Sequence, residues 1–459
     1  MRFHFHLPKA HARDMTVGSI PLQIIQFAIP LMLGNMFQML YNTVDVWVVG
    51  QYVGKEALAA VGSTSMITNM AIFFFNGFSI GASVLIGHHF GAKNEELLHH
   101  TIETTMATAF ILSALFTIVG ILSVQPMLVL MKTPSDVMQS ATTYLRIYFV
   151  GISGLLIYNL GSAILRAVGN TIYPLIFLAI TSVLNTVLDL FFVIVLGAGI
   201  AGVAYATIIS QIISALLVLL MLMNTKEVYR FTWHDIKIKW NILRDIVSIG
   251  LPAGIQSIIT SLSNIFVQSY INSFGSDCMA GWGCYDKLDH FITLPMQSVS
   301  MSTTAFVSQN IGAQQEERSE KGIRFSIALS VGITMSIGAI LYVFANMAIG
   351  FFTREASVIE YGVMFFRNNV FFLAANCINF ILASALRGHG DSKAPMLIMI
   401  SSFVLIRQCY LFIINTVFTA SAALVGFGYP VGWLACLMIE VPYYFFVHKP
   451  RVKKYSPVS

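Results

Sequence analysis

The segments AILRAVGN (163–170) and SALRGHGD (384–391) are two copies of one pattern, and each is followed by a proline, Pro174 or Pro395. In both copies the arginine, the glycine three positions after it and the proline keep the same order, and all three recur with one identical offset in numbering. A fixed offset shared by separated motifs is the sequence signature of an internal duplication. We therefore expect two similar halves.

The repeat extends well beyond these segments. The same offset also places HHFGA (88–92) on QNIGA (309–313), and Pro30 recurs as Pro252 with an offset that differs by a single position. Each half contains six apolar runs, so both copies are expected to have the same orientation in a membrane. This is a parallel repeat, and transport proteins of that kind bind their substrate at the interface of the halves and work by rocking one half against the other.

Apolar residues dominate the chain. Hydrophobic residues make up 56% and charged residues 10%, with a mean hydropathy of +0.76, whereas soluble proteins carry roughly 25% charged residues. The apolar runs are long enough to cross a hydrocarbon core of roughly 30 Å as helices and lack the alternation of barrel strands. The sequence predicts an all-α polytopic membrane protein with spans at 24–50, 57–87, 101–125, 142–166, 172–196, 201–223, 246–272, 278–309, 323–350, 360–386, 394–418 and 424–447.

These twelve spans divide into two pseudo-symmetric six-helix bundles: an N-lobe at 1–223 and a C-lobe at 246–459, joined by a basic cytoplasmic linker at 224–245. Most of the 26 Lys and Arg residues fall in links on the side of both termini. By the positive-inside rule both termini are cytoplasmic and the protein lies in the plasma membrane. The net charge of +5 follows from this bias, so we expect no nucleic-acid partner. The five cysteines show neither metal-ligand nor disulfide spacing.

Three features resemble the multidrug and toxic compound extrusion (MATE) family over essentially the whole chain. The first span reads IPLMLGNMFQMLYNTVDVWVVG (29–50), the second and eighth end in FGA and QNIGA, and the fourth and tenth end in LRAVGN and LRGHGD. The resemblance implies the MATE-type fold and a multidrug exporter coupled to H⁺ or Na⁺, without another cofactor. The DinF-like or MepA-like branch is the most similar, because the acidic residues of the NorM-like pattern correspond to the neutral Thr260 and Asn376.

The resemblance implies a cation-coupling site in the N-lobe at Asp45, Asn185, Asp189 and Thr207. Carboxylates inside a span are costly and usually mark a functional site. Asn185 and Asp189 share a helix face at i, i+4, and Asp45 and Asp189 are expected at similar depth in the outer half of the bilayer. Two adjacent carboxylates disfavour simultaneous ionisation, so the pair should bind a proton or a cation. The amide and hydroxyl oxygens would complete a hard-oxygen site suited to Na⁺.

Five further residues are candidates for substrate contact: Gln38, Tyr41, Asn159, Asn376 and Arg407. Gln38 lies two helical turns before Asp45 on the same face and offers both a donor and an acceptor. Arg407 lies mid-span, where its charge calls for a partner or water. Glu440 is the obvious acidic candidate, although helical rise places the two at depths that differ by roughly 9 Å.

These features predict an antiporter of small organic molecules, cationic or aromatic, acting as a monomer in the lipid bilayer. The alternative is a flippase of lipids or lipid-linked glycans, a class similar to MATE proteins at superfamily level. A single central arginine argues against it. An intramembrane enzyme would need a nucleophile and a base at depth, but His290 stands alone within its span, so we expect no catalytic residues.

Overall fold

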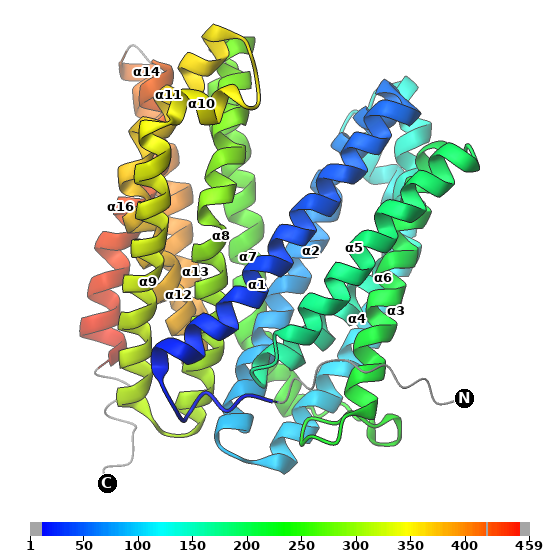
Figure 1. The fold of residues 1–459 in the computed structure, drawn as a ribbon, viewed down its shortest axis with the longest axis vertical. Coiled ribbons are helices and arrows are strands. Elements are labelled where there is room, and N and C mark those ends of the chain that lie inside the picture. The colour runs from blue at the N-terminus through cyan, green and yellow to red at the C-terminus, as the bar shows by residue number, and fades with distance from the viewer. Residues whose placement is uncertain (1–11, 419–420, 450–459) are drawn as a thin grey trace. The chain divides into compact units, whose positions relative to one another are not determined.

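The computed structural model describes residues 12–418 and 421–449, which are almost entirely helical and contain no strand (Figure 1). The helices form two compact units. The first unit contains residues 33–247 together with the described residues before Thr16, and the second contains residues 16–32 together with the described residues from Ser248 onward. This architecture confirms the all-helical fold class expected from the apolar runs.

The first unit is built from five complete helices and the C-terminal part of α1 (Ile20–Val48). A π-helical turn extends α1 at Val49–Val53, and another follows α5 at Phe191–Val195. A short 3₁₀ turn lies beyond the last helix at Trp233–Asp235. The five complete helices are α2 (Lys55–Gly91), α3 (Glu95–Leu130), α4 (Ser135–Ala167), α5 (Ile172–Leu190) and α6 (Gly199–Asn224).

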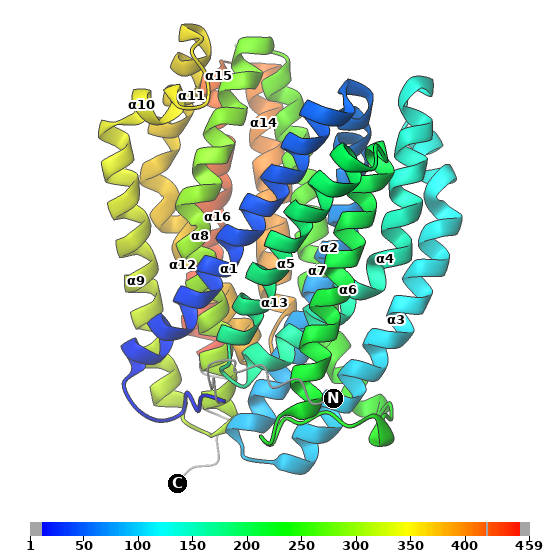
Figure 2. The same cartoon turned by 45° about the vertical axis from the view of Figure 1, so that its right-hand side comes forward.

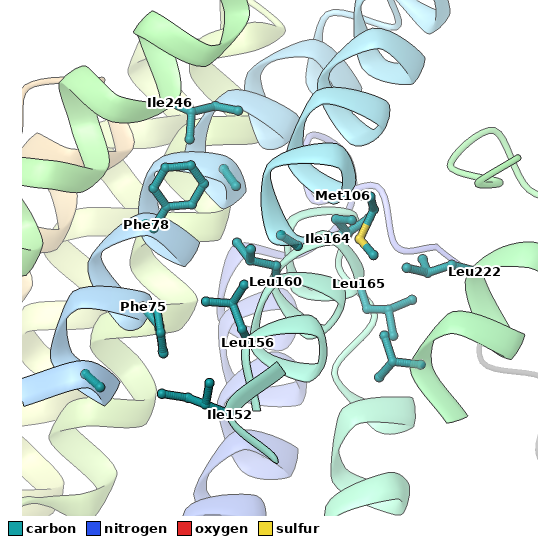
Figure 3. Packing of buried hydrophobic residues seen from close by; sticks show 14 of the residues in the cluster. Phe75, Phe78, Met106, Ile152, Leu156, Leu160, Ile164, Leu165, Leu222 and Ile246 are labelled. Atoms are coloured by element: carbon teal, nitrogen blue, oxygen red, sulfur yellow. The ribbon is translucent and has the colours of Figure 1, made fainter. Parts of the chain in front are cut away.

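Helix α4 is the centre of this unit, since it packs against α2, α3 and α6. Its apolar side chains meet those of α2, α3 and α6 in one continuous core, part of which is shown in Figure 3. Phe75 and Phe78 lie on α2, Met106 on α3 and Leu222 on α6. Bulky residues fill this core, so lipid or water does not separate the helices here.

The repeated motif of the sequence ends a helix in each unit. In the first copy the Asn170 N–H donates to the Leu165 carbonyl at 2.8 Å, and Gly169 has a φ of +83°. In the second copy the Asp391 N–H donates to the Leu386 carbonyl at 2.9 Å, and Gly390 has a φ of +91°. Both are Schellman caps, which need glycine because a positive φ is unfavourable for other residues.

The second unit has more interrupted helices. It begins within α7 (Trp240–Asn272), and π-helical turns at Ser401–Ile406 and Tyr443–His448 divide the later spans. A 3₁₀ turn at Val370–Phe372 joins α11 to α12. The remaining helices are α8 (Ser276–Gly312), α9 (Glu316–Val343), α10 (Ala345–Gly350), α11 (Ala356–Asn369), α12 (Leu373–Gly388), α13 (Lys393–Ile400), α14 (Arg407–Val417), α15 (Ala422–Gly426) and α16 (Gly428–Pro442).

Eleven helical stretches of the described chain are long and apolar enough to cross a membrane. They correspond to eleven of the twelve expected spans. The other expected span is α8, whose 37 residues extend about 55 Å at 1.5 Å per residue, well beyond the hydrocarbon thickness. Helix α8 is more polar because it carries acidic residues in its N-terminal half and many Ser and Thr residues in its C-terminal half. The chain is therefore a multi-pass membrane protein.

Residues 16–32 pack with the second unit, although the repeat places them in the first half of the chain. The Ser302 hydroxyl of α8 donates to the Ile24 carbonyl at 3.0 Å, and the Arg318 guanidinium donates to the Val17 carbonyl at 3.0 Å. Helix α1 thus begins in one unit and ends in the other. Pro30 lies near this change, where it removes one backbone donor from the helix.

Glycines allow α4 and α6 to approach closely, and a substitution at Gly154 tests this packing. A Cβ atom at Gly154 would lie 2.8 Å from backbone atoms of Gln211 and Ile212. We expect Gly154→Ala to destabilise the protein by about 1–3 kcal/mol through overpacking, measured as a lower thermal midpoint in detergent. Gly62→Ala is the matched control, because nothing lies within 4 Å of a Cβ there. Equal midpoints for the two variants would contradict the close approach.

Candidate functional site

The C-terminal ends of α1 and α5 and the N-terminal end of α6 meet in a small hydrophobic cluster of the first unit. Its buried members include Val48, Val193 and Val203, with Val44 and Leu190 packed against them. Val44 and Leu190 are the sequence neighbours of Asp45 and Asp189. Because successive helical residues point about 100° apart, packing these apolar neighbours together directs the two carboxylates into the space between the helices.

The carboxyl groups of Asp45 and Asp189 lie close enough to interact with each other. Asp189 is completely buried and Asp45 is half-buried. Neither carboxyl oxygen of Asp189 receives a hydrogen bond from a protein donor, and Asp45 Oδ1 also lacks one. Two carboxylates are acceptors only, so they can share this space only if a proton or a cation lies between them.

Asn185 and Thr207 lie at the level of these carboxylates. Asn185 precedes Asp189 by one turn, is 1% exposed, and has no partner for its side-chain oxygen or nitrogen. The Ser214 hydroxyl of α6 donates to Thr181 of α5 at 2.9 Å and fixes the register of the two helices, which run side by side (Figure 2). Asp189 lies two turns after Thr181 on α5, and Thr207 lies two turns before Ser214 on α6. Because the two helices are antiparallel, Asp189 and Thr207 lie at the same level.

Thr207 keeps its lone pairs free for a further contact. Its hydroxyl donates to the Val203 carbonyl at 3.0 Å, and Thr207 is 3% exposed. Ser210 lies one turn farther along α6, level with Asn185, and its buried hydroxyl has no partner. The site therefore offers oxygens of carboxylate, amide and hydroxyl type, which suit a hard cation such as Na⁺.

Two tyrosines lie beside the carboxylates, and a third stacks on one of them. Tyr41 of α1 and Tyr144 of α4 are close enough to both aspartates for their charges to interact, and Tyr144 stacks on Tyr148 with ring centroids 6.3 Å apart. Tyr148 in turn lies within hydrogen-bonding range of Gln211 on α6. The sequence had indicated Tyr41 alone. The i, i+4 spacing of Tyr144 and Tyr148 was the available signal, but it could not show which face of α4 points inward.

Two of the candidate substrate contacts lie apart from this cluster. Gln38 is exposed on α1, two turns before Asp45, and Asn159 of α4 is half-buried. The Asn159 amide donates to the Leu155 carbonyl of its own helix at 2.9 Å. Its oxygen remains available, whereas its nitrogen is already used. Of the five candidates, only Tyr41 adjoins the aspartates.

The remaining two candidates belong to the second unit. Asn376 of α12 is 6% exposed and its side-chain oxygen has no partner. Arg407, which begins α14, is 3% exposed and donates from Nη2 to Ser263 Oγ at 2.7 Å and Asn264 Oδ1 at 2.9 Å. Its guanidinium also lies over the Tyr429 ring, 5.0 Å from the centroid.

The pair of Arg407 and Glu440 that the sequence suggested does not form. Glu440 Oε2 instead accepts from the Cys436 thiol at 3.5 Å, and the charge that acts on Glu440 is that of Arg387 on α12. The Arg387 guanidinium donates to Gln256 Oε1 at 2.9 Å. Helical rise had already placed Arg407 and Glu440 at different depths, and their neighbours agree with that estimate.

Comparison with known proteins gives the family. The model of the MatE family matches residues 30–191 and 252–413, one match in each half of the repeat. The chain belongs to the MATE family. Among curated proteins it is 30% identical to the probable multidrug resistance protein YpnP of Bacillus subtilis (strain 168), over 92% of this chain and 93% of that protein. It is 29% identical to the probable multidrug resistance protein YoeA of the same strain, over 93% of each.

Solved MATE structures have the same fold. One, described as a MATE in the bent conformation, superposes with a TM-score of 0.91 at 23% identity and covers 97% of this chain and 98% of its own. At that identity the likeness shows the fold, so the geometry of the site must be argued from this chain's own residues. As a MATE protein the chain is a member of a multidrug efflux transporter family.

The proximity of Asp45 and Asp189 can be tested chemically. Cysteines at both positions, introduced into a variant without the five native cysteines, should be joined by a short bifunctional thiol reagent. Cleavage at a protease site inserted after Lys93 then leaves the two fragments linked on a denaturing gel. The control pair keeps Asp45→Cys and replaces Val183, which is 63% exposed on another face of α5; this pair should not crosslink. Equal crosslinking of the two pairs would contradict the site.

Proposed function

We propose that the protein is a secondary active exporter of small organic molecules, driven by exchange with H⁺ or Na⁺ bound between Asp45 and Asp189. The observation that carries the proposal is the facing pair of carboxyl groups, which lack protein donors inside an apolar helix bundle. Burying such a pair without a counter-charge costs several kcal/mol. The binding of a cation would supply the missing charge and compensate this cost.

The oxygen set supports either coupling ion. A proton shared by Asp45 and Asp189 removes one negative charge and satisfies one acceptor on each side. Na⁺ would use carboxylate oxygens together with the Asn185 amide oxygen and the hydroxyl of Thr207, all hard ligands. In both cases the bound ion removes the repulsion that keeps the carboxylates apart and draws α1 toward α5.

This movement of α1 provides the coupling. In the unloaded site two like charges oppose close packing of α1 on α5 and α6, whereas in the loaded site the packing is favourable. An ion that enters from outside therefore stabilises the conformation that has released cargo, and the departure of the ion to the inside resets the site. Such differential stabilisation of two states is what alternating access requires.

The tyrosines indicate aromatic or cationic cargo. Tyr41 and Tyr144 lie beside the two carboxylates and Tyr148 stacks on Tyr144; aromatic rings and carboxylates both attract organic cations. Cargo and coupling ion would compete for one negatively charged region, which makes their binding mutually exclusive. We further propose that the protein acts as a monomer in the plasma membrane with both termini cytoplasmic; the terminal residues themselves lie outside the part of the chain that the structure describes.

Transport by neutralised variants tests the proposal. In vesicles loaded with a fluorescent aromatic cation, Asp45→Asn and Asp189→Asn should each lower gradient-driven efflux about tenfold or more, since a charge-assisted contact is worth about 1.5–3 kcal/mol. Efflux is measured under an imposed Na⁺ gradient and an imposed pH gradient in turn, which identifies the coupling ion. Glu355→Gln, in an exposed loop, is the control. Near-normal efflux by both aspartate variants would refute the site.

A further inference from the structure

The second unit buries a positive charge without a negative partner. Arg407 is 3% exposed and lies about 21 Å along its span from Lys393, at 1.5 Å per residue. Within residues 12–418 and 421–449 no carboxylate forms an ion pair with it, and the one group whose charge acts on it is Tyr429. An uncompensated guanidinium at such depth is among the most costly arrangements in a membrane protein.

Glu440, Asp286 and Asp289 of this unit form no ion pair with Arg407. Glu440 accepts from Cys436 and interacts with the charge of Arg387. Asp286 and Asp289 of α8 act on Tyr429 but not on Arg407. Among the described residues the positive charge of Arg407 therefore has no paired carboxylate, although Asp286 and Asp289 lie near the tyrosine whose ring contacts it.

Neutral groups hold the guanidinium in one orientation. Ser263 Oγ donates to the Phe403 carbonyl at 2.9 Å and accepts from both Arg407 Nη2 at 2.7 Å and Gln408 Nε2 at 2.9 Å. This hydroxyl has thus used its single donor and both acceptor positions. With Asn264 on Nη2 and the Tyr429 ring against one face, the guanidinium is fixed before any ligand arrives.

The fixed group keeps an unused buried donor. Arg407 Nε is buried and has no hydrogen-bond partner, although an unpaired charged donor costs more than an unpaired neutral one. Because both N–H groups of Nη2 are already used, the Nε–H is left to donate one charge-assisted hydrogen bond to an oxygen of a carboxylate or phosphate. The unused donor, the missing counter-charge and the fixed orientation all fit an anionic ligand.

We infer that Arg407 binds the negatively charged group of an exported compound: a carboxylate, sulfonate or phosphate carried on a hydrophobic body. The inference rests on the proposed export function and extends its cargo from organic cations to organic anions and zwitterions. The Tyr429 ring already contacts Arg407 and packs against Trp282 and Trp433 in tilted and edge-on arrangements, with ring centroids 5.4 and 6.0 Å apart. This aromatic surrounding would favour an aromatic body.

The repeat supports a specialised role. The offset that relates the two copies of the helix-ending motif places Arg407 on Thr186, the neighbour of Asn185 in the cation site of the first unit. Equivalent spans thus carry polar sites at nearly the same level, one with carboxylates and one with an arginine. A purely structural link between α7 and α14 would need only the neutral hydrogen bonds of Ser263 and Gln408, which form without any charge.

A matched pair of ligands tests the inference on the purified full-length protein. An anthracene carboxylate and its methyl ester have the same ring and differ in charge, and their binding is followed by fluorescence in nanodiscs of zwitterionic lipid. The wild type should bind the acid at least tenfold more tightly than the ester. Arg407→Gln should abolish that preference, and Arg407→Lys should keep part of it because the charge remains.

The control variant is Arg367→Gln, which removes an exposed arginine that also lies over a tyrosine ring, that of Tyr342 at 5.3 Å. It should bind the acid like the wild type. Each sample is also checked for its thermal midpoint and for binding of a fluorescent aromatic cation. If Arg407→Gln does not fold, Ser263→Ala takes its place, and it should reduce the preference severalfold by releasing the guanidinium.

The outcomes separate this inference from the proposed function. An equal affinity of the wild type for acid and ester, or an unchanged preference in a folded Arg407→Gln protein, would overturn the anion site and leave cation-driven efflux untouched. Failure of ion-driven efflux with an intact Arg407-dependent preference would overturn antiport alone. Nanodiscs that contain phosphatidylglycerol distinguish the source of the anion: Arg407-dependent competition by this lipid would support the site and assign it to a lipid headgroup.

Discussion

The pair of carboxyl groups at Asp45 and Asp189 is the interaction on which the rest of the first unit depends. Asp189 is completely buried and Asp45 is half-buried, and neither the Asp189 oxygens nor Oδ1 of Asp45 receive a hydrogen bond from a protein donor. The surrounding packing must therefore hold two acidic groups close together. The hydrophobic cluster of Val48, Val193 and Val203 does this, because it fastens α1, α5 and α6 immediately next to the charges.

Wide helical turns accompany the charged positions in both units. The π-helical turn Phe191–Val195 begins two residues after Asp189, and the turn Ser401–Ile406 ends directly before Arg407. A π-helical turn inserts extra backbone into a helix and rotates the residues that follow it, which is why such turns are frequent at functional sites. The turn before Arg407 thus adjusts the direction of the guanidinium, whereas the turn after Asp189 rotates the residues beyond the carboxylate.

Much of this arrangement could be predicted from sequence because lipid leaves few options for a backbone. Apolar runs must be helices, so the spans followed from length and composition, including the span of the more polar α8. Asp45 and Asp189 stood out because carboxylates are rare in spans. Tyr144, Ser210 and Gln211 could not be singled out, since such side chains are common in helices. Which of them point toward the carboxylates depends on the rotation of each helix about its axis. The predicted partner of Glu440, Arg407, was wrong. The charge that acts on Glu440 is that of Arg387, which lies near a helix end, where lipid phosphates are the ordinary partners of arginine.

Duplication explains how two unlike sites came to occupy like positions. The repeat places Asp45 on Val267, a completely buried core residue, and Asp189 on Tyr410, so the second unit has no counterpart of the carboxylate pair. Conversely, Asn42 is exposed on α1, whereas its counterpart Asn264 holds Arg407. Under the proposed function the first copy binds the coupling cation, so the second copy does not need carboxylates at these positions and can carry a basic residue. The proposed cation and anion sites would then bind different ligands without competing.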